Sequence, residues 1–290
     1  MSKQIECVSG VGRIIEAGVD WLTITSKEPE KQERLQSLGQ ALIYNEHERG
    51  EKCSPWRLFN FEGYKCGGVA LAVNDEMTYM RLSSALAWSY WREAYQFASN
   101  CSRFDLQVTV TDVGPPEGVV LDCHQQALRH IASWKRKPEV ALRMSNRSSP
   151  TLYFNQRTSS RFGRIYDKAN ETKKDHYRGA VRFEVQFNDE TAWSMSKCIY
   201  RSTKFPQECT PFVSYFFGTR GVGSEFLGDV RRGVVPPRPS TNDDRRLEWL
   251  RRQCAPAVQE LLKRGRVSEV YIALGLPVPE ELDHNEEGEN

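Results

Sequence analysis

Two segments that lie far apart in the chain repeat one alternating pattern, and this pattern constrains the fold more than any other feature. "RFDLQV" begins at Arg103 and "RFEVQF" begins at Arg182; both read arginine, phenylalanine, acid, aliphatic, glutamine, apolar. Because side chains alternate between the two faces of a strand, each segment predicts a β-strand with one apolar and one polar face. A slip of one residue would bury the polar set, so we expect a firmly determined register.

The polar face of each predicted strand carries a carboxylate flanked by an arginine and a glutamine. The first strand presents Arg103, Asp105, Gln107 and Thr109 opposite Phe104, Leu106, Val108 and Val110. The second presents Arg182, Glu184, Gln186 and Asn188 opposite Phe183, Val185 and Phe187. If the two strands are neighbours in one sheet, Asp105 and Glu184 converge on the same face.

A third segment, "RFGRIYDKANE" from Arg161 to Glu171, places a tyrosine between two cations. Arg164, Tyr166 and Lys168 follow one another at two-residue spacing, so on an extended strand they share a face. This strand lies just before the strand that holds Glu184. The pattern fits either a solvated, charged strand surface or a tyrosine nucleophile beside the phosphate that it attacks.

The chemistry of these groups favours a divalent metal. Two neighbouring carboxylates repel each other unless a cation or a proton lies between them, and carboxylate oxygens suit Mg²⁺ or Mn²⁺. Such an ion polarises a phosphoryl oxygen and orients the leaving group. A phenol with a pKa of about 10 is a weak nucleophile at neutral pH, and we expect Lys168, Arg164 and the metal to favour its phenolate.

A purely structural interpretation of the same residues remains open. An arginine two residues from an aspartate on an exposed strand is usually a surface ion pair worth less than about 1 kcal/mol. The repetition between the two segments is also what similar amphipathic patterning alone would produce.

The order of predicted elements favours an α+β protein with a mainly antiparallel central sheet covered by helices, and with a C-terminal helical appendix. Strands are expected at 18–26, at several places within 56–82, and at 102–112, 139–144, 151–156, 161–168 and 179–188. Helices are expected at 26–43, with Ser26 as the N-cap, and at 83–99, 120–137, 190–200, 242–265 and 268–275. "GPPEG" and residues 218–241 are expected to be loops.

The chain is predicted to have three parts. Residues 1–235 form the catalytic and DNA-binding domain, residues 236–279 a C-terminal helical segment, and residues 280–290 an acidic, disordered tail. The tail holds six acids and no Lys or Arg, so the net charge of +2 for the whole chain becomes +8 once the tail is removed.

Composition limits the class of protein. A hydrophobic fraction of 39% suffices for a sizeable core, whereas no apolar run approaches a membrane span and no signal peptide is visible. The eight cysteines form no CxxC pair, and five histidines are too few for a zinc set. We therefore expect reduced thiols and a cytoplasmic location, with no membrane partner.

Several of these stretches resemble the replication initiation factor family, the rolling-circle initiators of certain plasmids, filamentous phages and integrative elements. The resemblance covers about residues 17–190. Its early "DW-L-T" strand is matched by "GVDWLTIT", its "R-x-D" strand by Arg103 and Asp105, and its "RxYxK" and "RxEx" strands by "RIYDKANE" and "RFEVQF". The family lacks the His-hydrophobic-His metal motif of other rolling-circle enzymes, and so does this chain. The terminal "LEWLRRQCAPAVQELL" also resembles the end of phage-type members.

The resemblance implies that one DNA strand is nicked and rejoined through a 5′-phosphotyrosine. It implies Tyr166 as the nucleophile, Lys168 and Arg164 as groups that serve the phosphate, and Asp105 and Glu184 as ligands of Mg²⁺ or Mn²⁺. Four further residues are candidates for supporting this site: Asp20, Glu171, Arg103 and Arg182. The implied partners are origin DNA, in single-stranded or hairpin form, a host replication helicase or polymerase, and a second copy of the chain.

Basic residues cluster on both sides of the tyrosine strand. The stretch from Arg129 to Arg147 holds six Lys/Arg against one acid, and the stretch from Arg157 to Arg182 holds eight against three. Such a surface binds nucleic acid through counterion release. The predicted DNA-binding residues are Lys135, Arg136, Lys137, Arg143, Arg147, Arg157 and Arg161. Trp134, Tyr153 and Phe154 lie among them, either to stack on unpaired bases or to pack in the core.

Three functions stay open from the sequence. The first is a tyrosine-dependent nicking and rejoining enzyme. The second is a replication or transcription regulator that binds an origin without cutting it, and the third is a metal-dependent hydrolytic nuclease. Tyr177 and Tyr200 compete with Tyr166 for the nucleophile, although Tyr177 lies in a predicted turn and Tyr200 at the end of an apolar helix.

Overall fold

The computed structural model describes residues 12–58, 60–135, 137–145, 148–202, 209–227, 250 and 254–273. The chain forms two compact units, Met1–Pro237 and Arg238–Asn290. The second unit contributes helices α9 (Ala255–Lys263) and α10 (Val267–Ala273). The predicted domain boundary near 235, the acidic tail and residues 242–249 and 251–253 of the predicted helix at 242–265 lie outside the described residues, whereas α9 lies within that predicted helix.

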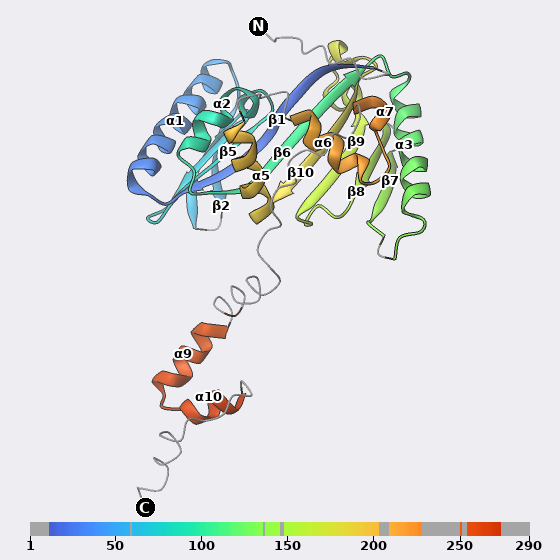
Figure 1. Ribbon diagram of the computed structural model, residues 1–290. Coiled ribbons are helices and arrows are strands. Elements are labelled where there is room, and N and C mark those ends of the chain that lie inside the picture. The colour runs from blue at the N-terminus through green and yellow to red at the C-terminus, as the bar shows by residue number, and fades with distance from the viewer. Residues whose placement is uncertain are drawn as a thin grey trace, which may run out of the picture. The chain divides into compact units, whose positions relative to one another are not determined.

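A ten-stranded sheet organises the first unit (Figure 1). Its strand order is β2-β3-β4-β5-β1-β6-β10-β9-β8-β7, and every pairing between these described strands is antiparallel. The strands are β1 (Arg13–Ser26), β2 (Cys53–Leu58), β3 (Phe61–Cys66), β4 (Val69–Val73), β5 (Thr78–Ser83), β6 (Asn100–Thr111), β7 (Val140–Ser145), β8 (Ser148–Phe154), β9 (Arg161–Asp167) and β10 (Val181–Asn188). The predicted α+β class with an antiparallel sheet is confirmed.

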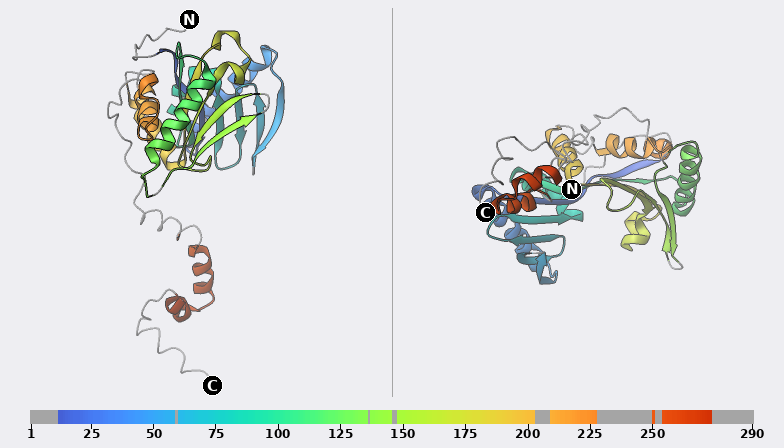
Figure 2. Two further views of the ribbon diagram at one scale, coloured as in Figure 1. Left: turned by 90° about the vertical axis from the view of Figure 1, so that its right-hand side faces the viewer. Right: turned by 90° about the horizontal axis from the view of Figure 1, so that it is seen from below.

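The long helices cover one face of this curved sheet, and the short helix α4 lies on the other (Figure 2). The helices are α1 (Pro29–Glu48), α2 (Ser84–Gln96), α3 (Pro116–Ile131), α4 (Lys168–Thr172), the 3-10 turn η1 (Asp175–Tyr177), α5 (Asp189–Arg201), α6 (Cys209–Gly218) and α7 (Ser224–Leu227). We call the face beneath the long helices the core face and the opposite one the site face.

The core face is built by the apolar sides of the two repeated segments. Phe104, Leu106, Phe183 and Val185 are all fully buried. Their strands β6 and β10 pair directly, with Leu106 opposite Val185 and Phe104 opposite Phe187. The predicted alternation is therefore confirmed, because burial of the apolar set determines the register.

Several local predictions were wrong. Ser26 ends β1 and is no cap; α1 begins at Pro29 after Glu28, because proline suits the first turn of a helix. Helix α3 begins at Pro116 inside the predicted "GPPEG" loop for the same reason. Lys168 is the first residue of α4 rather than the end of a strand. Helix α6, in the stretch "CTPFVSYFFG", was not predicted.

The expectation that all cysteines are reduced was also wrong. Cys53 and Cys66 lie directly opposite each other on β2 and β3, with Cα atoms 4.2 Å apart, and form a disulfide. The close approach of facing residues in an antiparallel pair makes this bond sterically accessible. No described helix is both long enough and apolar enough to cross a membrane.

Candidate functional site

The sheet order places the three predicted polar strands side by side as β6, β10 and β9. Gln186 lies opposite Asp105, and Glu184 lies opposite both Gln107 on one side and Arg164 on the other. Arg182 lies opposite Tyr166. Asp105 and Glu184 are therefore diagonal neighbours on the site face, and Tyr166 and Arg164 stand on the adjoining strand.

This part of the site face is buried, so the solvated strand surface that the sequence left open as one alternative does not apply to it. Asp105 is 1% exposed, Glu184 2% and Tyr166 5%. The sheet curves around its site face (Figure 2), so long side chains from neighbouring strands cover one another there. Buried charges are costly unless they are paired, and the pairing at this site is extensive.

Two arginines neutralise the two predicted metal-binding carboxylates. The Arg103 guanidinium donates to both carboxylate oxygens of Asp105, with a shortest distance of 2.5 Å. The Arg164 guanidinium lies 2.7 Å from Glu184. The hydroxyl of Tyr166 lies 3.1 Å from Glu184 Oε2 and donates a hydrogen bond to it, so the predicted nucleophile is bonded to a predicted metal ligand.

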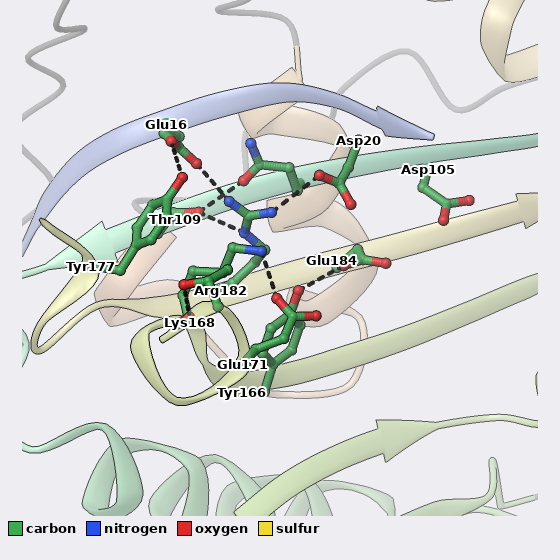
Figure 3. Close-up of polar contacts among 12 residues, drawn as sticks. Glu16, Asp20, Asp105, Thr109, Tyr166, Lys168, Glu171, Tyr177, Arg182 and Glu184 are labelled. Carbon is green, nitrogen blue, oxygen red and sulfur yellow. Dashed lines mark hydrogen bonds and ion pairs between the residues drawn. The ribbon is translucent and has the colours of Figure 1, made fainter. Parts of the chain in front are cut away.

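A second polar network adjoins the first through Arg182 (Figure 3). The Arg182 guanidinium contacts Glu16 at 2.6 Å, Asp20 at 3.2 Å and the Thr109 hydroxyl at 2.9 Å. Glu16 also accepts a 2.6 Å hydrogen bond from the Tyr177 hydroxyl. Arg182 and Asp20 thus reach the site region as predicted.

Glu16 was missed and Asp20 was hard to place because β1 is irregular. Simple alternation puts Asp20 on the side of Leu22 and Ile24, which is the core face. The pairing of β1 with β6 shifts register between Ile14 and Glu16, and again between Val19 and Trp21. Such bulges redirect the following side chains, and the sequence carries no clear signal for them.

Helix α4 brings a lysine and an acid to the site. Lys168 Nζ donates to Glu171 Oε2 at 2.6 Å and lies 5.8 Å from the ring centres of both Tyr166 and Tyr177. The Asp167 side chain caps this helix by accepting from the Asn170 backbone N–H at 3.0 Å. Tyr177, expected to be a poorly positioned turn residue, is therefore held close to the same lysine as Tyr166.

Burial controls the ionisation of the main groups. It raises the pKa of Asp105 to about 7, against the opposing effect of Arg103 and with a further contribution from Glu184. Burial and the neighbouring Glu184 also raise the pKa of the Tyr166 phenol well above its usual value, despite Arg164 and Arg182. Arg164 therefore favours the phenolate, as expected, but without a metal ion desolvation outweighs its effect on the pKa.

The carboxylates provide part of the ligand set that a metal needs. Within the described residues, no group of three or more His, Cys, Asp and Glu side chains is arranged to hold a metal ion. Mg²⁺, however, is commonly bound by one or two carboxylates together with substrate phosphate oxygens and water. Asp105 and Glu184 are diagonal neighbours on the site face, and Glu184 lies close enough to raise the pKa of Asp105, so this pair fits that donor set.

A pocket of about 230 Å³ opens beside Tyr166. Its walls come from β8, β9 and α4, and most of them are polar: Ser149, Thr151, Tyr153, Arg164, Asp167, Asn170 and Glu171. The pocket could accommodate a group about as large as a nucleobase next to the phenol.

The predicted DNA-binding residues are distributed over different parts of the fold. Lys135, Lys137 and Arg157 are exposed, whereas Arg136 and Arg147 lie outside the described residues. Arg143 is on the site face, with its guanidinium 5.3 Å from the ring centre of Tyr153, which in turn stacks on Phe162.

Arg161 and Phe154 do not belong to the site face. Arg161 has the same strand parity as Gly163, whose position contacts Phe216 of α6, so Arg161 points toward the helices. Phe154 is fully buried and packs against Phe216 and Phe217. Successive side chains of a strand point to opposite faces of the sheet. Residues close in sequence to the basic positions of the site face can therefore lie on the core face.

Comparison with known proteins identifies the fold. No protein-family model matches this chain, and no curated protein matches it significantly. Among solved structures it is similar to the rolling circle replication initiator protein from Geobacillus stearothermophilus, with 18% sequence identity and a TM-score of 0.50. The match covers 69% of this chain and 84% of that chain. The fold that the motif resemblance implied is thus shown.

Proposed function

We propose that this chain initiates rolling-circle replication by nicking and rejoining one strand of origin DNA through Tyr166. The observation that carries the proposal is the hydrogen bond between Tyr166 and Glu184, set beside Asp105 and within a ring of arginines on one sheet face. The fold shared with a rolling circle replication initiator supports it.

The proposed reaction is a transesterification at a DNA phosphate. The Tyr166 oxygen attacks the phosphorus and forms a 5′-phosphotyrosine, while the bond from phosphorus to the 3′ oxygen breaks and leaves a free 3′-OH. Glu184 orients the phenol and is the nearest acceptor for its proton. Rejoining is the reverse step, in which a 3′-OH attacks the phosphotyrosine and releases Tyr166.

The neighbouring cations serve the charge of the phosphate. Arg164 stands on the same strand face as Tyr166, and its guanidinium lies 4.9 Å from the Tyr166 ring centre. Lys168 approaches the same ring from α4. Charged donors held in a buried site stabilise a developing negative charge more strongly than they would in water, and the polar pocket beside Tyr166 offers space for the adjoining base.

A Mg²⁺ or Mn²⁺ ion held by Asp105 and Glu184 would polarise a phosphoryl oxygen. An ionised carboxylate has about four lone-pair positions, so Glu184 can accept from Tyr166 and Arg164 and still contribute an oxygen. We expect Asp105→Ala and Glu184→Ala each to weaken Mn²⁺ binding in calorimetry and to abolish cleavage while origin binding persists. Normal Mn²⁺ affinity in both variants would remove the pair from the ligand set.

The decisive test is covalent capture of DNA. The full chain is incubated with single-stranded origin DNA from its own replicon and Mn²⁺, and then run on a denaturing gel. We expect a protein–DNA adduct whose nucleotide maps to the peptide containing "IYDK". Tyr166→Phe should form none, whereas the matched variant Tyr200→Phe, altered at an aromatic packing residue, should form as much as the wild type.

The same experiment separates the alternatives. An origin-binding regulator would give neither adduct nor cleavage, and a hydrolytic nuclease would cleave without an adduct. An adduct that survives in Tyr166→Phe and maps to Tyr177 would transfer the role to Tyr177, which is also bonded to a carboxylate. The proposed partners are origin DNA, a host helicase or polymerase and a second copy of the chain, in the cytoplasm.

A further inference from the structure

The half of the site face formed by β2–β5 and β1 carries rings and cations that the proposed chemistry does not use. We propose that this surface binds a single-stranded segment of the DNA that continues from the cleaved phosphate; the proposal rests on the proposed function and extends it. We call the surface the cation–aromatic platform; its residues are Trp21, Trp56, Phe61, Lys65, Tyr79 and Arg81. Arg103 of β6, which holds Asp105, borders it.

The sheet register arranges the cations in one row across the strands. Lys65 pairs with Ala70, Ala70 with Arg81, Arg81 with Thr23, and Thr23 with Arg103. Cations therefore stand on alternate strands, about 10 Å apart given the spacing between neighbouring strands. The residues between them, Ala70 and Thr23, have short side chains. The longer cationic side chains therefore stand above their neighbours along this row.

Aromatic rings flank these cations closely. The Arg81 guanidinium lies between two indoles, 5.1 Å from the ring centre of Trp21 and 5.3 Å from that of Trp56. Tyr79 packs against Trp56, with ring centres 5.3 Å apart. These rings are partly exposed, and partly exposed rings beside cations are what unpaired bases stack on.

Arg81 differs from the three arginines that surround the candidate site because it has no acidic partner among the described residues. Arg103, Arg164 and Arg182 each hold a carboxylate. Arg81 forms no ion pair with any described carboxylate. Its Nε is buried and has no hydrogen-bond partner within the described part of the chain.

The surroundings of Arg81 make an anion the natural ligand. Arg81 forms no ion pair with a described carboxylate, and a phosphate oxygen that accepts from its guanidinium would supply the missing negative charge. The site-face positions of β2–β5 hold no acid: they are Ser54, Trp56, Leu58, Phe61, Gly63, Lys65, Ala70, Ala72, Tyr79, Arg81 and Ser83. Positive charge without counterions and stacking rings together specify single-stranded nucleic acid rather than a small anion.

The platform is continuous with the candidate site. Trp21 pairs directly with Asp105 across β1 and β6. Arg103 holds Asp105 and also lies 4.2 Å from the ring centre of Trp21. A strand whose phosphate lies at Asp105 and Tyr166 therefore meets Trp21 and Arg81 next on this side of the sheet.

The test measures binding of the full-length protein to three oligonucleotides that contain the cleavage site. One is short, and the other two add ten unpaired nucleotides on the 5′ or the 3′ side. Arg81→Gln and Trp56→Ala are compared with two control variants, which change residues on the core-face side of the β2–β3 hairpin. These are Arg57→Gln, whose exposed guanidinium pairs with Glu62, and Tyr64→Ala, which has 59% of its surface exposed.

We expect wild type to bind one of the extended oligonucleotides more tightly than the short one. Arg81→Gln and Trp56→Ala should each lose about ten-fold in that affinity, and Arg81→Gln should also lower the salt slope by about 0.7. Adduct formation on the short oligonucleotide should be unchanged in both variants. The two control variants should match the wild type in their affinity for the extended DNA and in adduct formation.

Three results would overturn the platform: equal affinity of wild type for short and extended DNA, unchanged affinity in both platform variants, or equal losses in the control variants. If Arg81→Gln and Trp56→Ala lost as much affinity for fully duplex DNA as for the extended oligonucleotide, the platform would not be specific for unpaired bases. Absence of any adduct in wild type would instead reject the proposed function, and the binding comparison would still decide whether the platform exists.

Discussion

At the residue scale, Tyr166 illustrates how burial changes the meaning of a motif. Its neighbours Arg164 and Lys168 suggested a phenol activated by positive charge, yet the ring is almost completely buried and its hydroxyl is bonded to Glu184. Burial raises its pKa, so in the folded protein it is a neutral phenol that needs its proton accepted as it reacts. The proposed nucleophile is therefore held as a neutral phenol, hydrogen-bonded to Glu184.

Tyr166→Phe should be less stable than the wild type by about 1–2 kcal/mol, because it leaves a buried Glu184 oxygen with one donor fewer. An exposed hydroxyl would contribute less than about 1 kcal/mol, so the larger loss follows from burial. Urea unfolding measures the difference, with Tyr200→Phe as the control. A variant as stable as the wild type would mean that the Tyr166–Glu184 hydrogen bond contributes nothing to the fold.

The raised pKa of Asp105, about 7, makes stability depend on pH in a defined direction. A carboxyl whose pKa is higher in the folded than in the unfolded protein stabilises the fold while it is protonated. That contribution is complete below about pH 4 and is lost as the pH rises through about 7. In metal-free buffer Asp105→Asn should therefore gain stability relative to the wild type between about pH 4 and pH 7, by at most about 1.4 kcal/mol per pH unit, and the difference should level off above about pH 7.

Urea unfolding of both proteins across this range measures the effect, and Asp122→Asn, an exposed site on α3, is the control. A difference between Asp105→Asn and wild type that stays constant with pH would show that Asp105 keeps an ordinary pKa in the folded protein.

At the scale of elements, α4 and β1 position most of the side chains that the strand pattern did not provide. Helix α4 supplies Lys168 and Glu171, and it exists because Asp167 caps its first turn. Strand β1 supplies Glu16 and Asp20, and its register shifts turn both toward Arg182. Short and irregular elements thus complete a site that the regular strands begin.

Asp167→Ala should cost about 1 kcal/mol of stability, because it removes the cap of α4 together with a 3.1 Å hydrogen bond from Ser149. It should also slow adduct formation, since Lys168 is the first residue of the helix that loses its cap. Asp167→Asn retains a capping oxygen and should recover most of both properties. Normal adduct formation in Asp167→Ala would indicate that Lys168 does not need α4 for its position.

At the scale of the whole first unit, the antiparallel sheet separates two tasks. Its core face is covered by long helices (Figures 1 and 2). Its site face gathers carboxylates, arginines, tyrosines and the platform rings. The predicted basic surface is not one patch: Lys135 and Lys137 follow α3, Arg143 lies on the site face, and Arg161 points toward the helices.

The pair Lys135 and Lys137 should contact phosphate without reading sequence. Replacing both with alanine should weaken binding to origin and random DNA alike. The slope of log affinity against log salt should fall by about 0.7–0.9 for each lost contact. Titration at several salt concentrations measures it, with Lys31→Ala, a partly exposed residue of α1 that pairs with Glu28, as the control. An unchanged slope would place both lysines in bulk solvent.

The sequence by itself determined the pattern of the central strands. Alternation in "RFDLQV" and "RFEVQF" was enough to predict their two faces, and the adjacent tyrosine strand was enough to predict which polar residues meet. This worked because a two-residue period is a local property, and burying one face is the strongest constraint on a strand.

Only the tertiary structure decided how buried that polar face is and which residues complete it. Glu16, Tyr177 and Arg81 come from segments with no common motif, and they meet the site through sheet order, register shifts and a capped helical turn. Helix α6 escaped prediction because its apolar run lacks a clear helical period. The pKa values of Asp105 and Tyr166 depend on desolvation, which arises only when distant parts of the chain enclose the same group.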